Sequence, residues 1–230
     1  MRDFNFNQGP IVMGDGLRKY MTSVYNKMFL ALCLTGVVSF VCVSNPVILQ
    51  FMAGGFSILL MLATLGIVIY LSARIQKIDS ERANALFWIY SALVGASLSP
   101  LFVVYTGESI ANAFFMTAVF FGGMSLYGYV TKKDLTGVGS FMIVGLFAVI
   151  ITSLVNLFLR SSALQLGLSA LTIVIFCGLT AYDVQKIRAF YDPTIDEEIL
   201  KKRAVLGSLS LYLDFINIFL ALLRLMGNRR

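Results

Sequence analysis

Seven long runs of apolar residues account for most of this chain, and they constrain its fold more than any other feature. An α-helix rises about 1.5 Å per residue, so about 20 apolar residues cross the roughly 30 Å hydrocarbon core of a bilayer. A helix also satisfies its own backbone hydrogen bonds where no water is present. The runs therefore predict seven transmembrane helices, at residues 28–44, 48–73, 84–105, 111–130, 137–159, 163–182 and 204–226.

The chain outside these runs is too short to form a soluble domain. Hydrophobic residues make up 58% of the sequence and charged residues only 13%, a balance that excludes a water-soluble globule of 230 residues. We predict an all-α polytopic membrane protein with an N-terminal segment at 1–27 and a seven-helix transmembrane domain at 28–230. No small-residue cleavage site clearly follows the first run, so we expect that run to be an uncleaved span rather than a signal peptide.

The histidine and cysteine content excludes several kinds of site. The chain has no histidine, which removes the usual zinc sites, histidine-based catalytic triads and histidine-based pH sensing. Its three cysteines, Cys33, Cys42 and Cys177, lie in apolar runs without metal-ligand spacing, and their odd number argues against a disulfide framework. We expect small buried thiols, no catalytic residues and no bound cofactor.

Lysine and arginine are distributed unevenly between the two sides of the predicted bundle. Fourteen of the 18 lie before the first run or in the second, fourth and sixth connections, which share one side. The positive-inside rule places this side, and the N-terminal segment 1–27, in the cytoplasm. Seven crossings then put the tail outside with Arg224, Arg229 and Arg230, whereas a re-entrant last segment would return them to the basic side. The net charge of +6 reflects topology and lipid contact and requires no nucleic-acid partner.

A single carboxylate, Asp214, lies within the last apolar run, LSLYLDFINIFLALLR. An ionised Asp at the centre of a membrane helix costs about 2.5–3.5 kcal/mol on insertion scales, so it usually has a partner or a function. It belongs to a face of small and polar residues that repeats every three or four positions: Gly207, Ser210, Asp214, Asn217, Ala221 and Arg224. Close helix packing explains the small members of this face, but it does not explain Asp214.

A second carboxylate, Asp183, ends the sixth run in GLTAYDVQKIR. The sixth and seventh helices are antiparallel neighbours, so Asp183 and Asp214 lie at similar depth. Two carboxylates in contact at low dielectric do not both ionise readily, so such a pair would share a proton and respond to pH. Arg74 ends the second run on the same side and is a candidate partner. The alternatives are a solvated helix end for Asp183 and a topology anchor for Arg74.

Several stretches resemble one known family. AYDVQKI and SLYLDFINIFLALLR resemble the signature of the Bax inhibitor-1 family, the transmembrane Bax inhibitor motif proteins. LSPLF, FFGGMSLYGYVTKKDL and LVNLF resemble bacterial members, so the likeness covers the second to seventh spans. The resemblance implies a seven-helix fold with the last helix enclosed by the other six, and location in a bacterial inner membrane. It also implies a pH-dependent calcium leak controlled by paired aspartates, here Asp183 and Asp214, with Arg74 as the latch arginine.

Three functions are compared. The first is a calcium leak channel, because carboxylate and amide oxygens suit Ca²⁺ and Asp183, Asp214 and Asn217 offer a transient site without a full cage. The second is a membrane-embedded regulator that binds other membrane proteins, such as a quality-control protease or a cell-death regulator, without transport. The third, an intramembrane aspartyl protease, lacks the G-x-G-D and P-A-L motifs, since the second aspartate stands in LYLDFIN. We therefore expect no enzyme.

Overall fold

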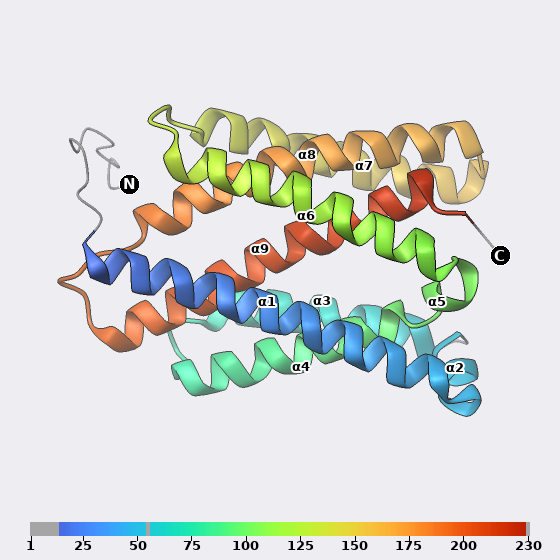
Figure 1. Ribbon diagram of the computed structural model, residues 1–230, viewed down its shortest axis with the longest axis horizontal. Helices are drawn as coiled ribbons and strands as arrows, with labels where there is room; N and C mark the ends of the chain where they lie inside the picture. Colours follow the sequence, from blue (N-terminus) through green and yellow to red (C-terminus); the bar gives the residue numbers. More distant parts are fainter. Residues whose placement is uncertain (1–13, 54–55, 229–230) are drawn as a thin grey trace.

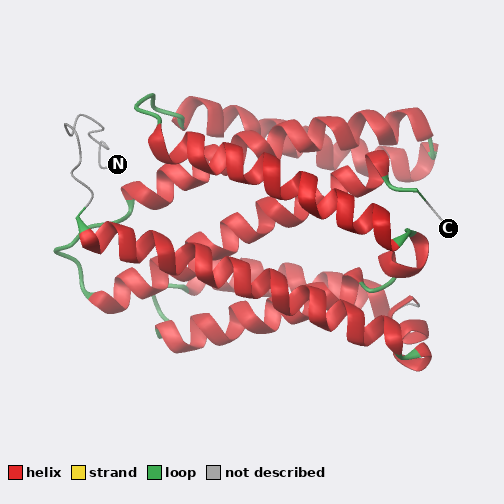
Figure 2. Ribbon diagram, in the orientation of Figure 1, coloured by secondary structure: helices red, strands yellow, loops and turns green. Residues whose placement is uncertain are grey.

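The computed structural model describes residues 14–53 and 56–228, and within these ranges every regular element is a helix (Figures 1 and 2). The all-α prediction is confirmed. The helices are α1 (Asp15–Ser44), α2 (Pro46–Ala53), α3 (Phe56–Arg74), α4 (Ser80–Leu98), α5 (Leu101–Val104), α6 (Gly107–Val130), α7 (Thr136–Leu159), α8 (Ser162–Ala189) and α9 (Glu197–Met226).

The number of long apolar helices agrees with seven membrane spans. Six segments in the described ranges are long and apolar enough to cross a bilayer, namely α1, α4 with α5, α6, α7, α8 and α9. The seventh is α3, whose 19 residues correspond to about 28 Å of helix. Large apolar side chains cover its outer surface and that of α7, for example Phe141, Phe147 and Phe158. The chain is an integral membrane protein.

Two predicted spans are interrupted. The predicted span 48–73 is divided between α2 and α3, on either side of residues 54–55, which lie outside the description. The predicted span 84–105 is divided between α4 and α5 at Pro100. Proline has no backbone N–H and disfavours helix at the preceding residue. The Ser99 hydroxyl and backbone N–H instead close the end of α4 by donating to the carbonyl oxygen of Ala96, at 2.7 and 3.3 Å.

Three helices extend beyond the hydrophobic runs. Helix α1 begins at Asp15 rather than at residue 28, so residues 15–27 of the predicted N-terminal segment are helical, and residues 1–13 lie outside the description. Helix α8 continues to Ala189 and α9 begins at Glu197, which shortens their connection to residues 190–196. Hydropathy locates the part of a helix in hydrocarbon, whereas the helix itself continues to the headgroups.

The short α8–α9 connection is held by its own polar side chains. The hydroxyl and backbone N–H of Thr194 both donate to the Asp192 carboxylate, at 2.7 and 2.9 Å, and these bonds lower the pKa of Asp192 below its usual value. Asp196 caps α9 by accepting from the backbone N–H of Glu198. This connection therefore returns the chain directly into the last helix.

Helix α9 lies at the centre of the bundle, as the resemblance implied. In its most apolar 18-residue window 61% of the residues are buried, against 6% for α7. Figure 1 shows α9 running between two groups of helices, α6, α7 and α8 on one side and α1, α3 and α4 on the other. Its chief neighbours are α8, α1, α6 and α4, whereas α3 packs on α4 and α7 packs on α8. Four helices, rather than all six as the resemblance implied, thus enclose α9, and the other two spans lie outside them.

Close approach of helix backbones holds each group together. Gly128 on α6 lies directly against α8, where an added Cβ would collide with the carbonyl oxygen of Ala181. Gly95 on α4 lies in the same way against the carbonyl oxygen of Thr35 on α1. The Ser39 hydroxyl donates to the carbonyl oxygen of Gly95 at 2.6 Å. Small residues at such contacts are the usual basis of helix association in membranes.

We expect Gly128→Ala to destabilise the bundle by about 1–3 kcal/mol, the usual cost of forcing an extra methyl group into a packed contact. The measurement is the unfolding temperature of the purified protein in detergent. Gly122→Ala, on the same helix, is the matched control, because a Cβ at that position meets nothing within 4 Å. Equal unfolding temperatures for the two variants would show that α6 and α8 do not approach as described.

Candidate functional site

The Asp214 carboxyl lies inside the protein rather than at a helix end. Its side chain belongs to α9 and only 3% of the residue is exposed. One of its oxygens, Oδ2, has no hydrogen-bond partner among the described residues. A buried polar group without a partner costs stability, and such groups are few in native proteins. At least one oxygen of Asp214 therefore makes no hydrogen bond that would stabilise the fold, so stability does not explain why the carboxyl is buried there.

Asp183 of α8 and Asp214 of α9 each lie beside the other helix at the α8–α9 contact. The Asp214 carboxyl interacts with Thr180 of α8 and lies within electrostatic reach of Asp183. The Asp183 carboxyl interacts with Ser210 of α9. Each acid thus lies beside a hydroxyl of the other helix. The Thr180 hydroxyl is oriented by its bond to the carbonyl oxygen of Phe176 at 2.7 Å.

The two acids differ in their access to solvent. Asp183 is half-buried and lies one helical turn before Lys186, which is exposed and within electrostatic reach of it. The Lys186 ammonium lies 5.7 Å from the ring centroid of Tyr182 and 5.8 Å from that of Phe190. Asp183 is therefore at the partly open end of the site, and Asp214 is at its closed end.

The polar face of α9 continues beyond the acids, as predicted. Gly207 and Ala221 are buried, Ser210 and Asn217 are half-buried, and Arg224 is exposed. The Asn217 amide nitrogen donates to the carbonyl oxygen of Leu213 at 2.8 Å, so its amide oxygen remains an available acceptor. This oxygen and the two carboxyls are the oxygen ligands that the predicted calcium site would use.

The structure places Arg74 apart from both carboxyls. It is exposed at the end of α3, a helix whose chief neighbours are α4 and α2 rather than α8 or α9. In the described part of the chain, ion pairs join Arg82 to Asp79, Lys201 to Glu197 and Lys202 to Glu198, and none includes Arg74. A latch formed by Arg74 would therefore need a contact with the carboxyls that the described arrangement does not contain.

The site has too few ligands to store a metal ion. No three or more His, Cys, Asp or Glu side chains within residues 14–53 and 56–228 are arranged so that they could hold a metal ion together. Calcium takes six to eight oxygen ligands in proteins. Two carboxyls and one amide oxygen would have to be completed by water, which suits a transient site.

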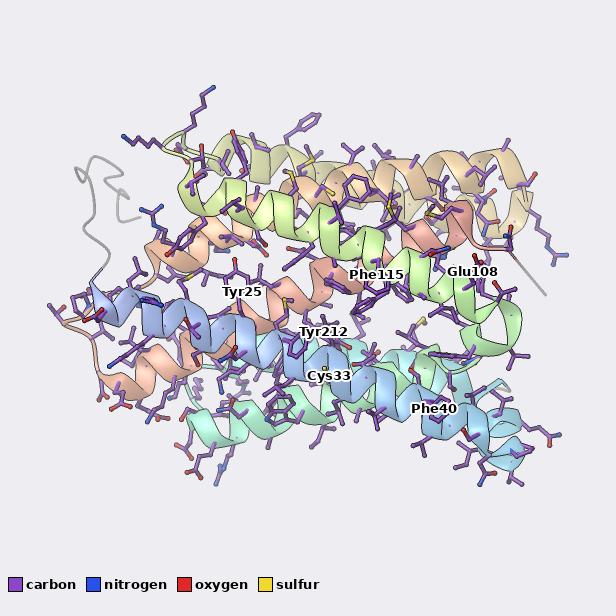
Figure 3. The ribbon with its side chains drawn as sticks, viewed as in Figure 1. Tyr25, Cys33, Phe40, Glu108, Phe115 and Tyr212 are labelled. Atoms are coloured by element: carbon purple, nitrogen blue, oxygen red, sulfur yellow. The ribbon has the colours of Figure 1, made fainter. Side chains whose placement is uncertain are left out.

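A second polar contact, beside the acids on α9, was not found from the sequence. Tyr212 is fully buried, and its hydroxyl lies 2.7 Å from the Thr35 hydroxyl of α1 (Figure 3). Thr35 lies within hydrogen-bond distance of the carbonyl oxygens of Ala31 and Ser91, both at 2.9 Å, so Tyr212 is the donor of the pair. The network ties α9 to α1 and α4. The sequence signal for this contact was a tyrosine within an apolar run, because a buried tyrosine hydroxyl usually has a hydrogen-bond partner.

Comparison with known proteins agrees with this architecture. The sequence model of the family described as Inhibitor of apoptosis-promoting Bax1 matches residues 17–230. The chain belongs to this family. The match covers α1 to α9 and therefore both aspartates, whose signature segments first suggested the Bax inhibitor family.

Bacterial relatives are similar over nearly the whole chain. The inner membrane protein YbhL of Escherichia coli strain K12 is 45% identical over 219 residues, covering 94% of each chain. An uncharacterized protein of Rickettsia prowazekii is 48% identical over 217 residues, covering 94% of this chain and 92% of its own. An uncharacterized protein of Caulobacter vibrioides is 38% identical over 249 residues, covering all of both chains.

We expect Asp214→Asn to raise stability at pH 8, by about 1 kcal/mol or more, because the amide has nearly the shape of the carboxyl but cannot carry a buried charge. The unfolding temperature at pH 8 in detergent measures the effect. Tyr212→Phe is the comparison, because it removes a buried hydrogen bond and should lower stability by about 1 kcal/mol. A lower unfolding temperature for Asp214→Asn would show that the carboxyl is kept for folding rather than for function.

Proposed function

We propose that this Bax inhibitor family protein forms a pH-sensitive calcium leak pathway, gated by Asp183 and Asp214. The observation that carries the proposal is the Asp214 carboxyl, which is 3% exposed, has an unpartnered oxygen and lies within electrostatic reach of a second carboxyl. Acids inside membrane helices usually mark ion or proton pathways. In this chain they are also the groups that can bind a divalent cation at depth.

The pair would work as a gate through its shared charge. With one proton between them, the carboxyls can hydrogen-bond and hold α8 and α9 together. When both are ionised, their repulsion must be relieved by separation, by a cation, or by Arg74 after movement of α3. Protons and calcium therefore compete for the same oxygens.

In the described arrangement, apolar side chains close the proposed ion pathway beyond Asp214. On the side away from Asp183, α9 presents the buried residues Ile218, Leu222 and Leu223, which pack with Phe176 and Ile175 of α8. Hydrophobic constrictions of this kind close a pore by excluding water. In our proposal, ionisation of the pair loosens the α8–α9 contact and opens this seal.

We further propose that the protein resides in a bacterial inner membrane with its N-terminus in the cytoplasm. The name of the Escherichia coli relative, an inner membrane protein, supports the location. The orientation rests on the lysines and arginines at the end of the bundle where α1 begins, according to the positive-inside rule.

Purified protein in liposomes loaded with a calcium dye should admit calcium faster than empty liposomes at some pH between about 5 and 8. We expect Asp214→Asn to lower the rate about tenfold or more, which corresponds to the loss of roughly 1.4 kcal/mol of cation binding. Asp79→Asn is the matched control, because Asp79 is an exposed acid at the same end of the bundle.

The pH profile of the same flux tests the pairing. If the acids are coupled, each single variant, Asp183→Asn or Asp214→Asn, should shift the pH midpoint of calcium entry that the remaining acid produces. The double variant should lose this midpoint. Calcium entry no faster than in empty liposomes across this pH range would refute the channel and favour a regulator that binds other membrane proteins.

Arg74→Ala should shift both the rate of calcium entry and its pH midpoint if α3 moves to bring this guanidinium to the carboxyls. Lys77→Ala is the control, since Lys77 is also exposed and lies within one turn of Arg74. Identical profiles for both variants and the unchanged protein would assign Arg74 to topology alone.

A further inference from the structure

A groove of about 410 Å³ lies between α1 and α6, away from the α8–α9 site. Two turns of α1 and the last turns of α6 line it, with Arg18, Met21, Thr22, Tyr25, Asn26, Ser125, Leu126 and Tyr129. Figure 3 shows Tyr25 on the side of α1 that faces α6. The lining combines one cation, four hydroxyls, an amide and two apolar side chains, and it contains no carboxyl. The volume is in the usual range for small-molecule sites.

The groove contains a buried hydroxyl without a partner. Ser125 is 6% exposed, and its hydroxyl makes no hydrogen bond within the described part of the chain. Other buried hydroxyls of the bundle donate to the carbonyl oxygen four residues earlier, as Ser91, Thr117 and Thr180 do at 2.7–2.8 Å. Tyr25 of α1 lies close enough to interact with Ser125, although the two hydroxyls do not reach hydrogen-bond geometry. A polar group in this position indicates a ligand that supplies the missing bond.

The position of the groove along the bundle matches the level of lipid headgroups. On α1 its residues 18–26 directly precede the apolar run that begins at residue 28, and on α6 its residues 125–129 are the last turn before the loop. Lys132 and Lys133 follow in that loop. The Arg188 guanidinium of α8 lies 5.6 Å from the ring centroid of Tyr129. Thr22, Asn26 and Leu126 are exposed, so the groove is open at the surface of the bundle.

We propose that this groove binds the phosphate and glycerol region of an anionic phospholipid. Arg18 contacts the phosphate, the Ser125 and Tyr25 hydroxyls bond to oxygens of the glycerol esters, and Met21 and Leu126 contact the start of the acyl chains. A lipid is favoured over a soluble phosphate because the groove lies at headgroup level, directly beside the apolar run of α1, and part of its lining is apolar. An anionic headgroup is favoured because the lining has a cation and no acid.

Lipid in this groove would join the two groups of helices that α9 separates. Helix α1 belongs to one group and α6 to the other, and each packs on α9 rather than chiefly on the other. A bound lipid would therefore add a contact between the groups at the basic end of the bundle.

Native mass spectrometry of the delipidated protein in detergent, titrated with phosphatidylglycerol or with phosphatidylcholine of the same acyl chains, tests the proposal. We expect tighter binding of phosphatidylglycerol. Arg18→Gln should weaken it about fivefold, the effect of roughly 1 kcal/mol for one cation at a membrane surface. Ser125→Val should weaken both lipids, because it removes the buried donor. Lys19→Gln should bind as the unchanged protein does, because Lys19 is exposed on the same turn but does not line the groove.

Three results would overturn the proposal: equal affinity for the two lipids, an equal loss in Lys19→Gln and Arg18→Gln, or full binding by Ser125→Val. Glycerol 3-phosphate is added as a competitor, and displacement of the lipid at similar concentrations would assign the groove to a soluble phosphate ester instead. If Ser125→Val does not elute as a single folded species, Ser125→Ala takes its place, since it removes the hydroxyl without adding volume.

Discussion

The placement of α9 between two groups of helices is the constraint on which the rest of the structure depends. A carboxyl in the hydrocarbon region must be surrounded by protein, and α9 is the helix that carries one at its centre. The groups α6–α8 and α1–α4 both pack on it, and Tyr212, Gly207 and Ser208 are the contacts by which they do so. Tyr212 bonds to Thr35, Gly207 lies against Ile187, and the Ser208 hydroxyl donates to the carbonyl oxygen of Val24 at 3.0 Å. Without α9, the two groups of helices would contact each other only along their edges.

Most buried Ser and Thr hydroxyls in this bundle hydrogen-bond to a carbonyl oxygen of their own helix. The few hydroxyls that do not are therefore informative. Ser91, Thr117 and Thr180 donate to carbonyl oxygens one turn earlier, which satisfies them without any tertiary contact. Thr35 bonds in addition to another helix, and it marks the place where α1, α4 and α9 meet. Tyr20, Ser125 and the Asp214 Oδ2 atom have no hydrogen-bond partner in the described ranges. Ser125 and Asp214 lie at the two sites proposed here, whereas Tyr20 lies at neither.

The sequence predicted the helical class, the number of spans and the contact between the helices that carry Asp183 and Asp214, because apolar length and antiparallel connection determine these features. It did not predict the break at Pro100 or the early start of α1 at Asp15, because hydropathy reports the solvent around a helix rather than the ends of its hydrogen bonding. The distance of Arg74 from the acids also could not be predicted. That distance depends on α3 packing on α4, and a sequence pattern does not specify which neighbour a lipid-facing helix selects.

The exposure of α7 has a consequence for the thickness of the surrounding membrane. Its 24 residues correspond to about 36 Å, which exceeds a hydrocarbon core of about 30 Å, and only 6% of its apolar window is buried. A helix longer than the hydrocarbon core is accommodated by tilting, by kinking or by local thickening of the bilayer, and its packing on neighbouring helices sets the tilt. Because α7 packs on α8 at Gly139 and Gly178, where side chains of the partner helix fill the space left by the missing Cβ, a change in tilt is transmitted to α8. Hydrophobic mismatch thereby acts on the helix that carries Asp183.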